Sequence, residues 1–112
     1  MAENLKTIEI SDRVANELLK ISDPQVVTSL KRFQVHPRPT MRSWDYGEEG
    51  EAFTCWHVFE DKRSDTAIVY CSQGFGPKRG WGLVSLSGSY MGMDSAWFAS
   101  LEEAFRESQF SD

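Results

Sequence analysis

The chain has 112 residues, of which 40% are hydrophobic and 12% aromatic, and its formal net charge is −5. This length fits one domain over residues 1–112, and the composition is that of a packed globule rather than a disordered tail. No apolar run approaches the ~18 residues that a membrane span needs, and the first residues lack a secretory signal, so we expect a cytoplasmic protein. The acidic total argues against a nucleic-acid partner, because phosphate contacts require a basic face.

The first third of the chain is predicted to be helical. Residues 6–10 are too short to assign and fit either a strand or the entry to a helix. Ser11 is a plausible N-cap for a helix that runs to about Ser22. Asp23 and Pro24 then form a second start signal, an N-cap followed by proline at the first helical position.

The segment 31–42 is basic, because it contains four Lys and Arg residues and no Asp or Glu. Its basic residues are Lys31, Arg32, Arg38 and Arg42, with His36 among them. The second helix must end before Pro37 and Pro39, which force extended backbone. We therefore expect a solvated helix end followed by an exposed loop, whose charges are able to pair with the acidic segment that follows.

The second half of the chain is predicted to be sheet. The predicted strands are 51–60, 66–72 and 83–87, with 44–46 as a candidate edge strand. The polar turn 61–65 makes the first two a hairpin. Ser100 and Glu103 have capping-box spacing and indicate a short terminal helix. The fold is therefore predicted to be α+β, an antiparallel sheet of about four strands with N-terminal helices and a short C-terminal helix.

Two cysteines and a histidine lie in the predicted hairpin. Pairing symmetric about Arg63 places Cys55 opposite Cys71 and, on the same face, His57 opposite Val69. Zinc would need a fourth ligand, a Cys–His nucleophile would need an orienting third group, and a disulfide is disfavoured in the cytoplasm. We therefore expect both cysteines to be reduced and buried, and we assign no catalytic residue, metal ligand or cofactor.

The segment 74–82 contains four glycines and two basic residues. It matches neither the dinucleotide-binding nor the P-loop pattern, and a strand rather than a helix follows it. We expect a connection anchored in the core by Phe75 and Trp81. The alternative is a loop that binds a small ligand or phosphate, and its candidate residues are Gly74, Gly76, Lys78, Arg79 and Trp81.

The segment 44–51 combines aromatic and acidic side chains. The candidate partner-binding residues in it are Trp44, Asp45, Tyr46, Glu48, Glu49 and Glu51. Trp and Tyr dominate interface hot spots, and carboxylates steer a basic partner toward its site. A solvated turn is the alternative. We expect Trp44 and Tyr46 to be at least partly exposed if this segment binds a protein.

The second half of the chain also resembles a class of small bacterial proteins. The resemblance covers about residues 42–108 and depends on the motifs Gly74-Phe75-Gly76-Pro77, Trp81-Gly82-Leu83-Val84, Met93-Asp94 and Trp97-Phe98-Ala99-Ser100-Leu101-Glu102-Glu103-Ala104-Phe105. The general type is similar to cytoplasmic immunity proteins that neutralise secreted bacterial toxins, and it carries over no functional residue.

Three functional hypotheses follow from these patterns. The first is a non-enzymatic protein-binding domain, such as an immunity-like inhibitor of a basic partner protein. The second is a small-ligand or phosphate-binding module that uses loop 74–82. The third is an enzyme that uses Cys55 or Cys71 together with His57.

Overall fold

A computed structural model describes residues 2–44, 50–108 and 110 of the chain. The helices are α1 (Ala2–Lys20), α2 (Pro24–Phe33) and α3 (Leu101–Arg106), and two short 3-10 turns are η1 (Pro77–Arg79) and η2 (Asp94–Ala96). The strands are β1 (Gln34–Ser43), β2 (Ala52–Asp61), β3 (Thr66–Tyr70), β4 (Trp81–Ser85) and β5 (Trp97–Phe98). In the described part of the chain they form one antiparallel sheet in the order β1-β2-β3-β4-β5. The α+β prediction is confirmed, with five strands instead of about four.

The first helix begins earlier than the sequence suggested. α1 includes residues 6–10, so this stretch is helix and not strand, and Ser11 lies inside α1 instead of capping it. Ile10 and Val14 are both buried, four residues apart on one helix face. Burial of that face favours a helix that begins before Ser11 and continues through it, because tertiary packing outweighs a local capping signal.

The start of α2 and the central hairpin follow the predicted signals. Asp23 is the N-cap of α2, and its Oδ1 accepts a hydrogen bond from the Gln25 N–H at 2.9 Å. In the β2–β3 turn, Asp61 Oδ1 accepts from the Arg63 N–H at 3.0 Å, and Asp61 Oδ2 accepts from the Ser64 hydroxyl at 2.9 Å. The Asp61 side chain therefore holds the turn that joins β2 and β3.

The segment 34–43 is a strand, which corrects the prediction of an exposed loop. β1 is the edge strand beside β2, and its Ser43 pairs outward: the Ser43 N–H donates to Ser89 O at 2.8 Å, and Ser43 O accepts from the Met91 N–H at 3.1 Å. Because alternate residues of a strand direct their backbone groups to the same side, Pro39 also faces away from β2. Its missing N–H therefore removes no bond from the ladder, and Pro37 lies in the irregular stretch between Gln34 and Arg38.

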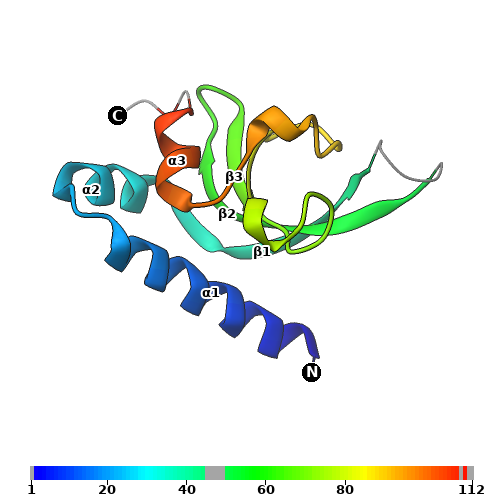
Figure 1. Ribbon diagram of the computed structural model, residues 1–112, viewed down its shortest axis with the longest axis horizontal. Helices are drawn as coiled ribbons and strands as arrows, with labels where there is room; N and C mark the ends of the chain where they lie inside the picture. The colour runs from blue at the N-terminus through cyan, green and yellow to red at the C-terminus, as the bar shows by residue number, and fades with distance from the viewer. Residues whose placement is uncertain (1, 45–49, 109, 111–112) are drawn as a thin grey trace.

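The sheet has an apolar cluster on each face, because consecutive strand residues point to opposite sides. The cluster on the face toward the helices includes Trp56, Val58, Phe59, Ile68, Tyr70 and Trp81, together with Ile10, Val14, Leu30 and Leu101 from the helices. The cluster on the other face consists of Cys55, Ala67, Val69, Cys71, Val84, Met91 and Trp97, with Trp44, Phe53 and Phe75 packed against it. Figure 1 shows α2 and α3 together at one end of the sheet and the β1–β2 arm at the other.

Two local contacts fix the C-terminal elements. A Cβ on Gly82 would lie 2.6 Å from the Trp97 ring, so the indole packs directly on the β4 backbone and only glycine fits there. Ser100 caps α3 by accepting from the Glu103 N–H at 3.2 Å. The Glu103 carboxylate accepts a hydrogen bond at 3.2 Å from the N–H of Ala99, the residue before the N-cap. The capping-box prediction is confirmed in this shifted form.

Candidate functional site

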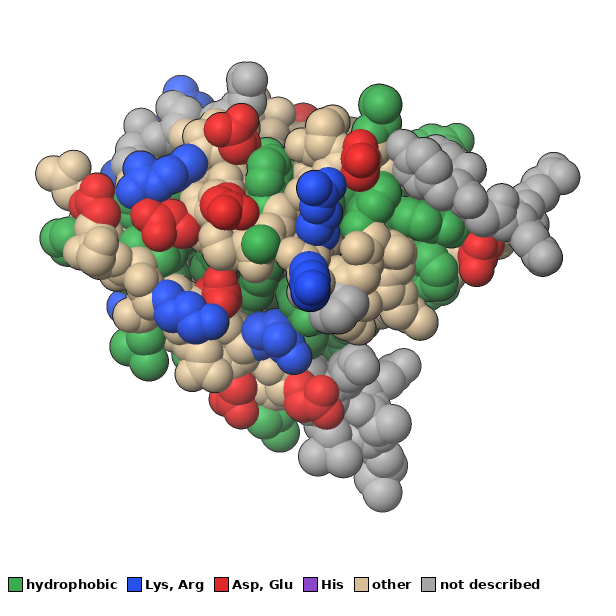
Figure 2. Space-filling model, in the orientation of Figure 1, with side chains coloured by type: hydrophobic (Ala, Val, Ile, Leu, Met, Phe, Trp, Pro, Cys, Tyr) green, Lys and Arg blue, Asp and Glu red, His purple; other side chains and the backbone are tan. Residues whose placement is uncertain are grey.

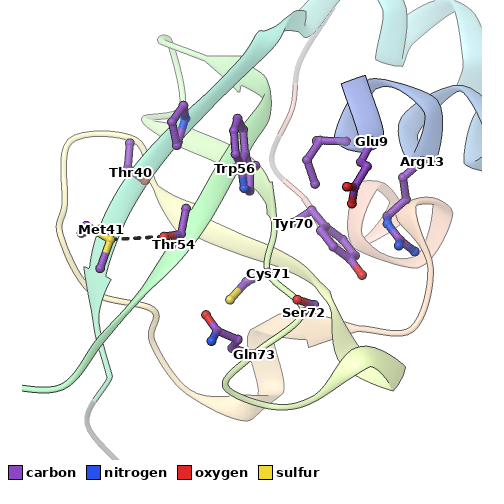
Figure 3. A pocket seen from close by; sticks show the side chains of 12 residues that line it. Glu9, Arg13, Thr40, Met41, Thr54, Trp56, Tyr70, Cys71, Ser72 and Gln73 are labelled. Carbon is purple, nitrogen blue, oxygen red and sulfur yellow. Dashed lines mark hydrogen bonds between the residues drawn. The ribbon is translucent and has the colours of Figure 1, made fainter. Parts of the chain in front are cut away.

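A groove of about 750 Å³ separates α1 from the helix-facing side of the sheet, and we call it the α1 groove. Its lining includes Glu9, Ile10 and Arg13 of α1, Pro39, Thr40 and Met41 of β1, Thr54 and Trp56 of β2, and the segment from Tyr70 to Gln73 that ends β3 (Figure 3). The groove brings together residues from four separate stretches of the sequence.

The groove exists because β1 and β2 continue past the end of β3. β3 ends at Tyr70, which pairs with Trp56, whereas β1 and β2 stay paired as far as Ser43 and Ala52. Thr54 lies two residues from Trp56 on the same strand and therefore on the same face. Among the described residues, no third strand continues beside β2 beyond the end of β3, and α1 forms the facing wall.

The lining of the groove is chemically mixed. Trp56 and Tyr70 are nearly buried and form part of its floor, and the Arg13 guanidinium carbon lies 4.6 Å from the centroid of the Tyr70 ring. Met41 is 62% exposed, and its sulfur accepts a hydrogen bond from the Thr54 hydroxyl at 3.3 Å. Aromatic residues, Met and Arg are the residue types enriched at protein–protein interfaces.

Glu9 and Arg13 place one charge of each sign on the helical wall of the groove. They are four residues apart on α1, and both are exposed (Figure 3). Figure 2 shows that acidic and basic side chains are also interspersed over the visible face of the molecule.

The predicted acidic–aromatic segment is only partly described. Asp45, Tyr46, Glu48 and Glu49 lie outside the described residues, and Glu51 is exposed. Trp44 is half-buried, with its ring centroid 4.7 Å from that of Phe75 and 5.6 Å from that of Phe53. Its partial exposure agrees with the expectation, but its packing belongs to the second apolar cluster and not to the α1 groove. A partner-binding role for this segment stays a prediction.

Loop 74–82 is anchored as expected. Trp81 is 3% exposed and packs 5.0 Å from the Tyr70 ring, and Phe75 is half-buried. Lys78 and Arg79 are exposed, and Arg79 Nη1 lies 4.0 Å from Asp94 Oδ2. Neither residue lines the α1 groove. A ligand-binding role for Gly74, Gly76, Lys78, Arg79 and Trp81 stays a prediction.

Cys55 and Cys71 are buried free thiols, as predicted. The hydrogen bond between the two thiols, together with burial, raises the pKa of Cys55. The same hydrogen bond lowers the pKa of Cys71, and the Gln73 N–H adds to this effect against the opposing effect of burial. Among the described residues, no group of three His, Cys, Asp or Glu side chains is placed to hold a metal ion.

A buried polar network around His57 was not foreseen from the sequence. The His57 Nδ1 lies 2.9 Å from Glu60 Oε2, and its Nε2 lies 3.2 Å from Arg42 Nη2. Because the Glu60 carboxylate only accepts, the proton of the neutral ring lies on Nδ1, and Nε2 accepts from Arg42. Burial lowers the pKa of His57, and Arg42 lowers it further. His57 is therefore a neutral side chain beside two cations, Arg42 and Arg38, and one carboxylate, Glu60.

Arg42 is 2% exposed, which corrects its prediction as a solvated residue. Its Nη1 donates to Tyr90 O at 3.0 Å, and its Nη2 donates to Ser85 O at 2.9 Å. The buried Arg42 Nε has no hydrogen-bond partner. Arg42 thus ties β1 to the segment that follows β4. The alternation of Arg38, Thr40 and Arg42 would have indicated a strand face, had residues 34–43 been recognised as a strand.

Comparison of the chain with protein-family models, with curated proteins and with solved structures finds no match. Within the described ranges, none of the helices combines the length and apolar character needed to cross a membrane.

Proposed function

We propose that this chain is a non-enzymatic protein-binding domain that holds a segment of a partner protein in the α1 groove. The observation that carries this proposal is that Trp56, Tyr70, Arg13 and an exposed Met41 line one groove of about 750 Å³. Hot spots of protein interfaces consist of such residues, placed where a partner side chain can displace water from them.

The rim of the groove favours a protein occupant over an enclosed small molecule. Glu9, Pro39 and Met41 are all exposed at its edges. Small-ligand sites usually bury most of the ligand surface, whereas a polypeptide segment can contact the floor and both rims of an open groove at once. Thr40, Thr54 and Gln73 supply hydrogen-bonding groups along the lining.

The charge of the chain supports a basic partner. With a net charge of −5, the protein attracts cationic surfaces and repels acidic ones, which accelerates encounter with a basic protein. Glu51 is exposed at the start of the hairpin arm whose residues line the groove. A small acidic domain that occupies the working surface of a basic partner would act as its inhibitor, in the manner of an immunity protein.

Two methionines provide a matched test of the groove. Met41 and Met93 are 62% and 65% exposed, but Met41 lines the groove and Met93 does not. Partners captured from the native host should bind Met41→Glu at least about tenfold more weakly than the unmodified chain, a loss of ~1.4 kcal/mol. Met93→Glu should bind normally. Equal binding by both variants, or weakening by Met93→Glu alone, would refute the proposed site.

A further inference from the structure

The two cysteines occupy a position in the sheet that suits a disulfide. The β2–β3 ladder pairs His57 with Val69 and Trp56 with Tyr70, so the next residues outward are Cys55 and Cys71. The Cys71 N–H donates to Gly80 O at 2.9 Å, on the side away from β2. Because the N–H and C=O of one strand residue point the same way, Cys55 and Cys71 form a non-hydrogen-bonded pair.

Such pairs bring side chains closer than hydrogen-bonded pairs do. Their Cα atoms are typically about 4.5 Å apart, within the roughly 4.4–6.8 Å that a disulfide spans. Cys55 and Cys71 also belong to the same buried apolar cluster, on the face of the sheet away from the helices. The sulfur atoms can therefore become bonded while β2 and β3 stay paired.

The two sulfur atoms are not equivalent. Cys71 belongs to the lining of the α1 groove and Cys55 does not, although both side chains are buried, at 1% and 0% exposed. The neighbouring Cys55 thiol lowers the pKa of Cys71 against the opposing effect of burial, and the Gln73 N–H lowers it further, which favours the Cys71 thiolate. Cys71 is thus placed to react first and Cys55 to react second.

We infer that Cys55 and Cys71 are a reversible dithiol switch that hydrogen peroxide oxidises to an intramolecular disulfide. The Cys71 thiolate attacks one peroxide oxygen, the O–O bond breaks, and the departing hydroxide takes a proton to become water. Cys71 is then a sulfenic acid. The Cys55 sulfur attacks the Cys71 sulfur, the S–O bond breaks, and a second water leaves with the Cys55 proton. The thiols lose two electrons, and peroxide gains them.

The first test uses the unmodified chain. After exposure of the folded, reduced protein to hydrogen peroxide, peptide mapping should find Cys55 joined to Cys71, with both thiols lost and both restored by dithiothreitol. The thermal midpoint of the oxidised form should rise, because the bridge restricts the unfolded chain. The same peroxide treatment of the chain unfolded in guanidinium shows that both thiols are chemically competent. Two free thiols in the folded sample, or bridges only between molecules, would overturn the inference.

Two alanine variants test the order of the steps. Cys55→Ala should accumulate a sulfenic acid at Cys71 that dimedone traps. In Cys71→Ala, the remaining Cys55 should react more slowly than Cys71 does in Cys55→Ala, because only Cys71 has the Gln73 N–H beside its sulfur and belongs to the groove lining. Equal rates in the two variants would refute the assignment of Cys71 as the attacking thiol. Circular dichroism tests whether each variant is folded. If a variant does not fold, peptide mapping of the unmodified chain still tests whether the disulfide forms.

Discussion

Acidification should destabilise this protein through His57. The imidazole is 1% exposed, and it faces Arg42 and Arg38 from β1 and Glu60 from its own strand. Protonation would place a third cation beside the two arginines, with only the Glu60 carboxylate to compensate. Burial and Arg42 consequently lower the pKa of His57 in the folded chain below its ordinary value of 6.5.

The size of the effect follows from proton linkage. In the unfolded chain His57 gains a proton below a pH of about 6.5, whereas in the folded chain it stays neutral until a lower pH. The contribution to stability is thus complete above pH ~6.5 and is lost as the pH falls from there through the folded pKa. Within that window the free energy of unfolding should fall by up to ~1.4 kcal/mol per pH unit.

Urea unfolding from pH 8 to pH 5 measures this slope, and the two histidines of the chain supply the control. His36 is exposed, so His36→Gln should keep the slope of the unmodified protein. His57→Gln should lose most of the slope between pH 6.5 and pH 5. It should also be less stable by ~1–3 kcal/mol at pH 8, because a partner of Arg42 and Glu60 is displaced. An unchanged slope in His57→Gln, or a slope that vanishes in His36→Gln, would show that the reasoning about His57 is wrong.

Two further predictions concern packing and the buried cation. Gly82→Ala places a Cβ against the Trp97 ring and should lower the free energy of unfolding in urea by ~1–3 kcal/mol. The control is Gly88→Ala, whose Cβ would meet only Ser85 at 3.2 Å or more and which should cost less. Equal losses in the two variants would contradict the close approach of Gly82 to Trp97. Arg42→Ala removes the donors to Tyr90 O and Ser85 O and should lower the free energy of unfolding by ~2 kcal/mol or more. Arg63→Ala, on the exposed turn, should change it by less than ~0.5 kcal/mol. An Arg42→Ala variant as stable as the unmodified chain would refute the structural role of these buried hydrogen bonds.

Much of the local structure could be predicted because local signals determined it. Asp23 and Pro24 start α2, the Asp61 turn joins β2 to β3, and Ser100 caps α3. In each case a side chain satisfies backbone groups within three residues, which is information that a short sequence window contains. The pairing of His57 with Val69 followed from the same turn.

The parts that could not be predicted depend on tertiary placement. Pro37 and Pro39 predict a loop where β1 lies, because proline is normally incompatible with a strand. Only the position of β1 at the edge of the sheet makes them acceptable. Without a predicted strand at residues 34–43, the burial of Arg42 could not be predicted either. The α1 groove arises where β1 and β2 outrun β3 and α1 lies across from them, and no motif in the sequence marks this arrangement.

Photo-crosslinking from within the α1 groove tests the binding proposal most directly. A photoreactive phenylalanine derivative at position 41 should form a covalent bond to the partner protein, and the same residue at the equally exposed position 93 should not. Peptide mapping of the product should find a single continuous segment of the partner attached at position 41. Crosslinking from position 93 with none from position 41 would place the interface elsewhere and contradict the assignment of the groove.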